Sequence, residues 1–339
     1  MSNRTRNAIY SLLLLVAILI VWKWRQGNRP SMVRIEGETM ATTYHVTYFD
    51  PAKRDFKKSI DSVLLLVNKS INTYDPTAEI TVFNRSKTGI KFDLPYFLPP
   101  LKKAKEVTEA TGGAFDPTVM PLVNAWGFGP DKEGVPDSAR VDSLRNLVGF
   151  RKIQFNNDSL WKTDQRAQLD FGGIGQGYGA DVITNFLRSK GVDNMFVELG
   201  GEGMAVGKNI ESGKPWQIGI LDPVNTVQFK AYISLSNRAF TTSGNYYNYR
   251  EVDGQRFSHT IDPTSGYPAR RAILSASVFA SDCTTADAWA TAIMVMGHEK
   301  AIGLLKDHPE LDAFLVYSTS TGVETFATPG ISGQLEIVK

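Results

Sequence analysis

The sequence predicts an α+β domain of mainly antiparallel strands, preceded by a hydrophobic segment at the N-terminus. Two observations favour this class. Helical and strand-like patterns are interleaved along the chain, and the part after residue 216 is mostly strand-like, with no repeated βαβ unit. The length of 339 residues, with 42% apolar and 21% charged side chains, suits one large domain or two closely fused ones.

Charge and cysteine content exclude several functional classes. The formal net charge is +2, from 37 basic and 35 acidic side chains. No basic stripe is interleaved with aromatic residues, so we expect no nucleic-acid partner. Cys283 is the single cysteine, which excludes an internal disulfide, a cysteine-rich zinc site and a CxxC redox pair.

The first element is the hydrophobic segment. Arg4 and Arg6 precede an apolar run over residues 8–22, and Lys23 and Arg25 follow it. This pattern is typical of a signal peptide or a membrane anchor. No small-x-small cleavage site follows directly, and no cysteine there can carry a lipid, so we expect an uncleaved anchor over residues 1–26. A linker over residues 27–35 then leads to a domain over residues 36–339. Arg4 and Arg6 should stay in the cytoplasm, which places the domain outside.

Periodic patterns predict the next elements. Strands are expected at residues 32–36 and 42–49, and apolar residues at helical spacing predict helices over residues 60–71 and 101–107. Asp137 or Ser138 is expected to cap a third helix. Between the second and third helices, residues 115–136 form a long loop rich in Gly, Pro and Trp, and loops of that length are usually functional.

The second half of the chain begins with a predicted strand, turn, helix and strand at residues 167–171, 172–178, 179–188 and 195–199. Strands are then expected at residues 216–221, 229–235, 256–261 and 272–280. Helices over residues 286–296 and 300–305 and a hairpin turn at residues 320–322 complete the pattern.

A glycine-rich run over residues 170–181 is the strongest local signal. It has five glycines in eight residues between a predicted strand and a helix. Glycines let backbone approach a ligand closely, and the N–H groups that begin the helix can bind phosphate. Gly175-x-Gly177-x-x-Ala180 also matches the dinucleotide fingerprint, with Glu198 near the position of the ribose-binding acid. The β-rich continuation argues against that interpretation, and a tight turn with close helix–sheet packing remains an alternative.

Asp287 and Thr291 are four residues apart on a predicted helix, so their side chains share one face. Such hard oxygen ligands suit Mg²⁺. The alternative is that Thr291 bonds back to the Asp287 carbonyl and that Asp287 only favours the helix start.

His259 stands at a strand end before a turn, where it can serve as a general base or contact a phosphate, although a single histidine is more often structural. Several loop aromatics suit stacking on a planar ring, or ordinary packing. They are Tyr74, Phe115, Trp126, Phe128, Tyr246 and Tyr247.

Eight short blocks, in order over about residues 37–328, resemble the ApbE family of Mg²⁺-dependent FAD:protein FMN transferases. They are residues 40–44, 73–76, 113–119, 170–181, 198–202, 242–246, 259–268 and 287–291. The resemblance implies a T-fold-related, two-lobed single domain with the flavin site between the lobes.

The resemblance also implies roles for individual residues. Positions that hold the flavin dinucleotide are matched by Met40, Tyr74, Ala114, Phe115, Asp116, Asp170, Gln176 and Ile261. The Mg²⁺ site is matched by the carbonyls of Gly173 and Ala290 and the side chains of Asp287 and Thr291, and His259 matches the residue that assists deprotonation of the acceptor. Gln176 stands where many members have Lys or Glu, and the missing lipid-carrying cysteine points to a transmembrane tether.

The implied reaction transfers FMN from FAD to a Thr or Ser hydroxyl of a partner flavoprotein and releases AMP. Acceptors of this family carry a motif of the type Asp-x-x-Ser/Thr-Gly-Ala-Ser/Thr, and we expect them among membrane electron-transport subunits. The chain's own Asp262-x-x-Ser265-Gly266 continues with Tyr267, so self-modification is not expected. We expect the enzyme at the cytoplasmic membrane with its domain on the periplasmic side.

Three other functions remain open at this point. A Mg²⁺-dependent FAD pyrophosphatase would use water as acceptor, and the tyrosine at Tyr74 argues against it. A tethered flavin-storage protein without catalysis is disfavoured by the intact pair of Asp287 and Thr291. An NAD(P) dehydrogenase ranks last.

Overall fold

The computed structural model describes residues 3–27, 30–131, 134–244, 249–252, 255–269 and 272–338. Tyr246 and Tyr247, the last residue of the block 242–246 and its neighbour, lie outside the described residues, as do two residues of the predicted loop 115–136.

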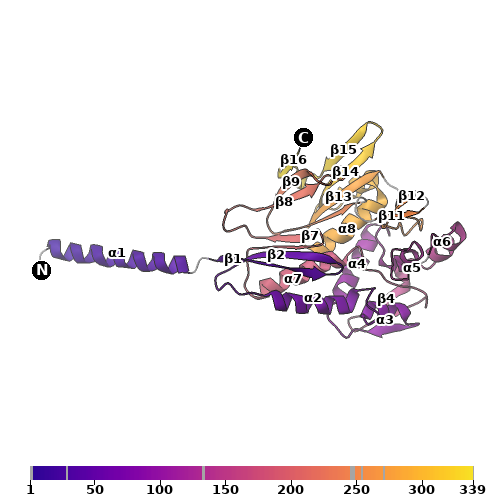
Figure 1. The fold of residues 1–339 in the computed structure, drawn as a ribbon, viewed down its shortest axis with the longest axis horizontal. Coiled ribbons are helices and arrows are strands. Elements are labelled where there is room, and N and C mark those ends of the chain that lie inside the picture. The colour runs from indigo at the N-terminus through magenta and orange to yellow at the C-terminus, as the bar shows by residue number, and fades with distance from the viewer. Residues whose placement is uncertain are drawn as a thin grey trace.

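An eight-stranded sheet runs through the domain (Figure 1), and every neighbouring pair in it is antiparallel. This confirms the α+β prediction and excludes a doubly wound sheet, whose strands would be parallel. The strands, in spatial order, are β1 (Ser31–Thr39), β2 (Thr42–Asp50), β6 (Met195–Leu199), β7 (Glu202–Val206), β10 (Arg238–Gly244), β13 (Ile273–Ala280), β14 (Asp312–Thr319) and β15 (Gly322–Ala327).

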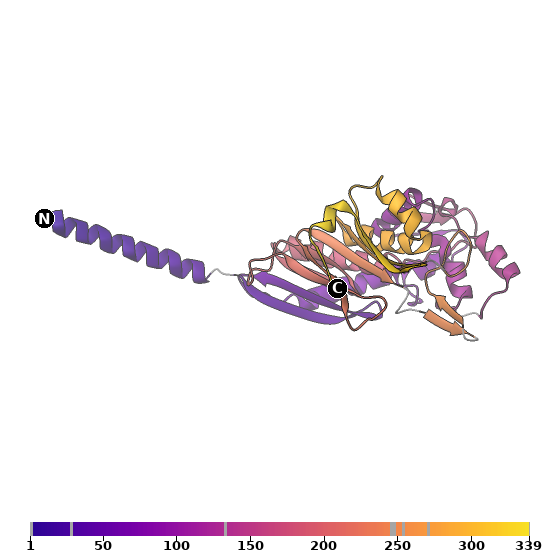
Figure 2. The same cartoon turned by 90° about the horizontal axis from the view of Figure 1, so that it is seen from above.

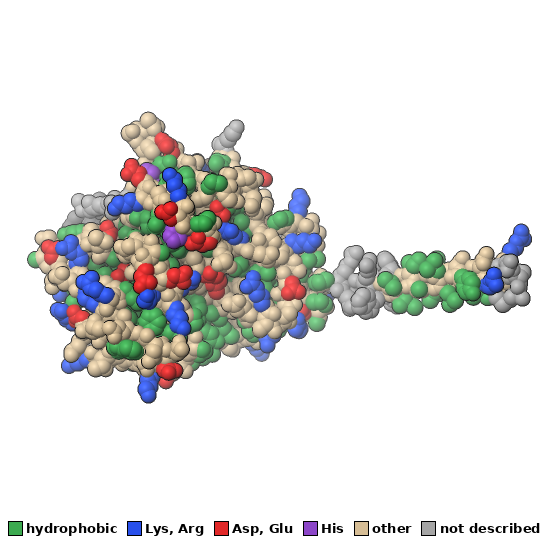
Figure 3. Space-filling view, turned by 180° about the vertical axis from the view of Figure 1, so that it is seen from behind, with side chains coloured by type: hydrophobic (Ala, Val, Ile, Leu, Met, Phe, Trp, Pro, Cys, Tyr) green, Lys and Arg blue, Asp and Glu red, His purple; other side chains and the backbone are tan. Residues whose placement is uncertain are grey.

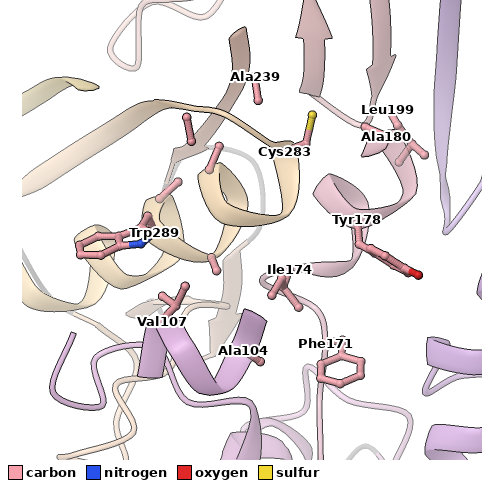
Figure 4. Packing of buried hydrophobic residues seen from close by; sticks show 14 of the residues in the cluster. Ala104, Val107, Phe171, Ile174, Tyr178, Ala180, Leu199, Ala239, Cys283 and Trp289 are labelled. Carbon is pink, nitrogen blue, oxygen red and sulfur yellow. The ribbon is translucent and has the colours of Figure 1, made fainter. Parts of the chain in front are cut away.

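Helices pack against one face of this sheet and enclose the larger core. They are α2 (Lys57–Ile71), α4 (Leu98–Ala110), α7 (Gly175–Ser189), α8 (Cys283–Met296) and α9 (His298–Leu305). Almost all of α8 is buried, because its many alanines let neighbouring helices and strands approach closely. Figure 4 shows α8 between α4 and α7, with Ile174 and Val107 in the same core.

A second, smaller core lies on the other face of the sheet. Trp216 packs on Phe196, whose ring stacks on that of Phe240 with centroids 5.6 Å apart. The covering elements are the antiparallel strands β8 (Trp216–Leu221), β9 (Phe229–Leu235) and β16 (Leu335–Ile337), with α10 (Pro329–Ser332) beside them. The central sheet is therefore buried on both faces.

Short elements complete the domain, and residues of the 119–148 segment form a third cluster with Ile261, which includes Leu122 and Val141. Asp137 caps α6 (Ser138–Arg145) as predicted, since its side chain accepts the N–H of Arg140 at 2.7 Å. These elements are α3 (Glu79–Arg85), β3 (Gly89–Lys91), η1 (Pro117–Val119), α5 (Met120–Ala125), α6 (Ser138–Arg145), η2 (Phe150–Lys152), β4 (Ile153–Phe155), β5 (Ser159–Lys162), β11 (Tyr249–Val252) and β12 (Gln255–Ser258).

Four predictions of individual elements differ from the structure. Residues 167–171 form no strand, because their backbone groups bond elsewhere. The Asn84 side chain bonds both the N–H and the carbonyl of Leu169, and the N–H of Asp170 donates to the Pro117 carbonyl. The predicted loop 115–136 contains η1 and α5. The helix expected at residue 179 begins at Gly175, inside the glycine run, and β1 begins at Ser31, inside the predicted linker.

At the N-terminus, α1 (Asn3–Gly27) extends away from the body in Figures 1 and 2. In the described part of the chain it is the one helix whose length and hydropathy suit a membrane span, with a mean hydropathy of 1.6 over Arg4–Val21. An N-terminal signal sequence has the same character.

Candidate functional site

The site is built where α7 and α8 touch at Gly177. A methyl group on Gly177 would lie 2.4 Å from the carbonyl oxygen of Cys283 and 2.7 Å from Cβ of Asp287. Both distances are far below normal contact, so the two helices can be this close only with glycine at that position. The glycine run therefore serves close packing of α7 on α8, whereas the alternative left open by the sequence was a tight turn with close helix–sheet packing.

Each of these helices supplies a carboxylate to the first turn of the other. Asp181 of α7 accepts the N–H groups of Cys283 and Thr284, both at 2.8 Å, at the start of α8. In return, Asp287 of α8 accepts the N–H of Gly177 through Oδ2 at 3.0 Å, in the first turn of α7. These exchanged caps satisfy backbone groups that have no partner within their own helix, and they fix the position of Asp287.

The first turn of α7 therefore differs from the phosphate cradle that the sequence suggested. The N–H of Gly175 is bonded to the carbonyl of Phe171 at 2.8 Å, and that of Gly177 to Asp287. With two of its first amides engaged inside the protein, this helix end has less capacity to bind phosphate directly than a free helix N-terminus.

Three oxygen groups surround the contact of the two helices. Asp287 is 5% exposed, and its Oδ2 accepts the Gly177 N–H, which leaves Oδ1 for another partner. The Thr291 hydroxyl lies 3.5 Å from the carbonyl oxygen of Gly173 and so points across to the glycine run. Ala290 is also buried, and it lies between Asp287 and Thr291 in the sequence of α8.

Electrostatics at this point favour a cation. Burial raises the pKa of Asp287 to about 7; the Gly177 N–H opposes that rise and the charge of Asp181 adds to it. Glu202, at the start of β7, is 7% exposed, and its Oε2 is buried with no hydrogen-bond partner among the described residues. Burial and then the charge of Asp287 raise the pKa of Glu202. A bound divalent ion would offset this excess of buried negative charge.

The donor set fits Mg²⁺ better than zinc. The described residues contain no group of three or more His, Cys, Asp or Glu side chains that could hold a metal. One carboxylate, one hydroxyl and a backbone carbonyl are instead the sparse set of hard ligands with which Mg²⁺ keeps several waters or substrate oxygens. The residues present therefore fit Mg²⁺.

Met40 lies beside the glycine run, at the tip of the β1–β2 hairpin. Met40 and Ala41 form a two-residue turn with φ of 51° and 58°, a left-handed conformation that costs free energy in residues other than glycine. The Met40 side chain reaches Gly179, where an added methyl group would lie 3.4 Å from its Cε. At Gly200, an added methyl group would lie 2.9 Å from Nε2 of Gln176. Strain at such a tip is typical of functional positions.

Residues of the predicted loop 115–136 contact the glycine run at Asp170 and contact Tyr74 at Phe128. The N–H of Asp170 donates to the carbonyl of Pro117 at 2.7 Å, which joins the run to the 115–119 segment. Tyr74 is 62% exposed and donates to the carbonyl of Phe128 at 2.6 Å. Burial raises the pKa of Tyr74, and the charge of Asp170 adds to this rise.

Asp116 has a structural role that the sequence did not reveal. One of its oxygens caps η1 by accepting the N–H and hydroxyl of Thr118 at 2.8 and 2.6 Å, and the other accepts the N–H of Phe150 at 3.1 Å. Burial raises the pKa of this carboxyl group. Asp116 thus shapes the loop, while Ala114 and Phe115 pack against the main core.

His259 and Ile261 lie on a third segment. His259 is exposed just after β12, and Ile261 is buried in the third cluster with Leu122 and Trp126. The indole N–H of Trp126 donates to the carbonyl of Gly266 at 2.9 Å, which fixes this segment against α5.

The structure thus assembles most predicted residues around the glycine run. Gly173, Asp287 and Thr291 lie at the α7–α8 contact, whereas Met40 lies against Gly179 of α7 and Gln176 of α7 lies against Gly200. The segment that carries His259 packs against the 115–129 loop through Ile261 and Gly266. Sequence reasoning assigned no role to Asp181 or Glu202, although both stand within recognised blocks.

The fold and this site define a member of the ApbE family: the family model matches residues 40–315, and the chain belongs to that family. The FAD:protein FMN transferase of Vibrio cholerae is 35% identical over 304 residues, covering 87% of this chain and 90% of the relative. That of Haemophilus influenzae is 35% identical over 310 residues, covering 87% and 89%.

Solved structures agree. The flavin transferase ApbE from Vibrio cholerae superposes with a TM-score of 0.82 at 32% identity, covering 90% of this chain and 99% of that one. The apo form of the Pseudomonas stutzeri flavinyl transferase ApbE has a TM-score of 0.80 at 32% identity, covering 90% and 97%. The resemblance stated from the sequence is confirmed.

Proposed function

We propose that the protein is an FAD:protein FMN transferase that moves FMN from FAD to a Thr or Ser hydroxyl of an acceptor flavoprotein, with Mg²⁺ bound between α7 and α8. The observation that carries the proposal is the α7–α8 contact. It holds one buried carboxylate, a hydroxyl and a carbonyl together, and Glu202 adds a second buried acid whose Oε2 has no hydrogen-bond partner among the described residues. The chain is also over 30% identical to named transferases.

Asp287 Oδ1, the Thr291 hydroxyl and the carbonyls of Gly173 and Ala290 are the groups that would hold the metal. When bound, Mg²⁺ supplies charge neutralisation at the FAD pyrophosphate and at the leaving AMP. Asp287 must be ionised to act as a ligand, and with a pKa of about 7 it loses a proton as the site fills. The bond from the Gly177 N–H holds Oδ2 of Asp287 in place while Oδ1 is free to contact the metal.

The acceptor reacts by in-line displacement at phosphorus. The hydroxyl oxygen forms a bond to the FMN phosphorus, the bond from that phosphorus to the AMP oxygen breaks, and AMP leaves with the electron pair. We propose that His259 accepts the proton of the acceptor hydroxyl, because this histidine is exposed and so accessible to a partner protein. Met40, Tyr74, Ala114, Phe115, Asp116, Asp170, Gln176 and Ile261 are proposed to bind or shape the FAD site.

We further propose that α1 anchors the enzyme in the cytoplasmic membrane. Arg4 and Arg6 would stay in the cytoplasm and the domain would lie on the periplasmic side, where membrane electron-transport subunits with the acceptor motif are the proposed partners.

The test is incubation with FAD, Mg²⁺ and a peptide that carries the acceptor motif. The expected result is a peptide mass increased by FMN, together with free AMP. His259→Ala should abolish transfer but leave Mg²⁺ affinity unchanged, whereas Asp287→Asn should lose both. Free FMN without a peptide mass shift would identify a pyrophosphatase, and intact FAD would identify a storage protein.

A further inference from the structure

The end of the central sheet where β1 begins is held close to α1. Ser31 pairs with Asp50, so the start of β1 and the end of β2 lie together. Three residues, 28–30, separate α1 from β1, and a chain of that length spans at most about 14 Å from Gly27 to Ser31. If α1 crosses the membrane, this end of the domain cannot leave the bilayer surface.

Three loops share this end of the sheet. The segments 51–56, 190–194 and 207–215 are joined by hydrogen bonds. The N–H of Phe49 donates to the Asn194 carbonyl at 3.0 Å, the Lys208 N–H to the Asn194 side chain at 2.9 Å, and the Arg54 guanidinium to the Lys190 carbonyl at 3.0 Å. They form one continuous surface, which we call the anchor-side surface.

This surface carries an excess of exposed basic side chains. Figure 3 shows Lys and Arg on the end of the body that adjoins α1. Among the acids, Asp50 is buried and paired with Arg54, while Asp55, Asp193 and Glu211 are exposed. The basic residues of the three loops and the adjoining element ends are Arg34, Lys53, Arg54, Arg188, Lys190, Lys208 and Lys214, all exposed.

The charge changes sign along β1 toward the other end of the hairpin. Arg34 near the anchor is followed on the same strand by exposed Glu36 and Glu38, nearer to Met40. With nine residues at about 3.3 Å each, β1 spans about 30 Å from the anchor-side surface to the hairpin tip.

We propose that the anchor-side surface rests on anionic phospholipid headgroups, so that the β1–β2 hairpin holds the candidate FAD site about 30 Å from the bilayer. The basic loops meet the negative lipid surface, and the acidic tip faces away from it. The acceptor hydroxyl would then be modified well above the membrane, on an extramembrane domain. This proposal rests on α1 being an uncleaved anchor, and it is independent of the transfer chemistry.

The test uses the full-length chain in vesicles of phosphatidylcholine with or without phosphatidylglycerol. A spin label is placed at Ala52→Cys on the anchor-side surface, and in a control at Ser320→Cys in the β14–β15 turn at the opposite end of the sheet. Cys283 is fully buried, so it should not take the label. The readout is collision of the label with a water-soluble nickel complex, alongside intact mass and the transfer assay.

We expect the label at position 52 to lose collisions in phosphatidylglycerol vesicles and to regain them in about 1 M salt, where the Debye length is about 3 Å. The double variant Lys208→Glu/Lys214→Glu should also restore them, whereas Lys208→Arg/Lys214→Arg should keep the label shielded. The label at position 320 should stay accessible throughout.

Equal accessibility of position 52 in both kinds of vesicle, with residues 1–27 still present by mass, would overturn the membrane-contact proposal alone. A mature chain that lacks residues 1–27 would overturn the anchor and this proposal together. Neither result would bear on the transferase proposal, which is judged by the peptide mass shift.

Discussion

Replacing Gly177 with alanine tests the central claim that the α7–α8 contact positions Asp287. The new methyl group would lie 2.4 Å from the Cys283 carbonyl oxygen, about 1 Å short of an ordinary contact, and 2.7 Å from Cβ of Asp287. Its neighbours are a backbone group and a Cβ, which cannot rotate away. The helices must therefore separate by a distance of that order.

The expected magnitude follows from two opposing terms. Alanine favours a helix over glycine by about 0.5–1 kcal/mol, and overpacking costs about 1–3 kcal/mol. We expect a net loss of about 1–2 kcal/mol in the free energy of unfolding. Because the shift also moves Asp287 and weakens its bond to the Gly177 N–H, Mg²⁺ affinity should fall by about 10–100-fold.

Gly303→Ala is the matched control. Gly303 also lies within a helix, α9, but an added methyl group there meets nothing within 4 Å. This variant should gain about 0.5–1 kcal/mol and keep its Mg²⁺ affinity. Urea denaturation and metal titration calorimetry measure both quantities. If Gly177→Ala behaves like Gly303→Ala in both assays, the close contact does not position the site and the reasoning is refuted.

Three further predictions concern pH and backbone strain. The pKa of Asp287 is about 7 in the folded chain against an ordinary 3.8, so the metal-free folded state binds more protons and its stability should fall as pH rises between these values. Asp287→Asn should flatten this profile in denaturation curves recorded with a chelator; an unchanged slope would contradict the assignment. Burial lowers the pKa of Lys162 from 10.5 to about 8, so stability should rise with pH across that window, and Lys162→Met should stabilise the protein at pH 7 by about 2 kcal/mol in urea denaturation. A loss of stability in that variant would show that its bond to the Asn84 carbonyl outweighs the cost of burying the charge. Ala41→Gly relieves a positive φ of 58° and should add about 1 kcal/mol to the free energy of unfolding, with no loss of transfer activity. An unchanged melting curve would mean that the turn is not strained.

The local chemistry of the sequence determined much of the fold. Alternating and helical apolar spacing located most strands and helices, and Asp137 marked a helix start that the structure confirms. The spacing of Asp287 and Thr291 correctly placed both on one helix. These features depend on residues a few positions apart, which is why they can be read from the chain alone.

Prediction from the sequence was wrong where contacts between distant segments determine the local structure. The predicted strand at residues 167–171 is replaced by a loop because Asn84, 85 positions from Leu169, takes its backbone groups. The bond from the Phe150 N–H to the Asp116 carboxylate, across 34 positions, is another contact that the sequence did not predict.

The glycine run illustrates the division most clearly. Its composition showed that the backbone must come close to something, and the sequence left a ligand and close helix–sheet packing as the two alternatives. Only tertiary structure identified the neighbour as α8 and revealed that Asp181 and Asp287 exchange caps across more than 100 positions of sequence. A hydrogen bond between residues so far apart depends on the packing of the whole core, and no local pattern encodes it.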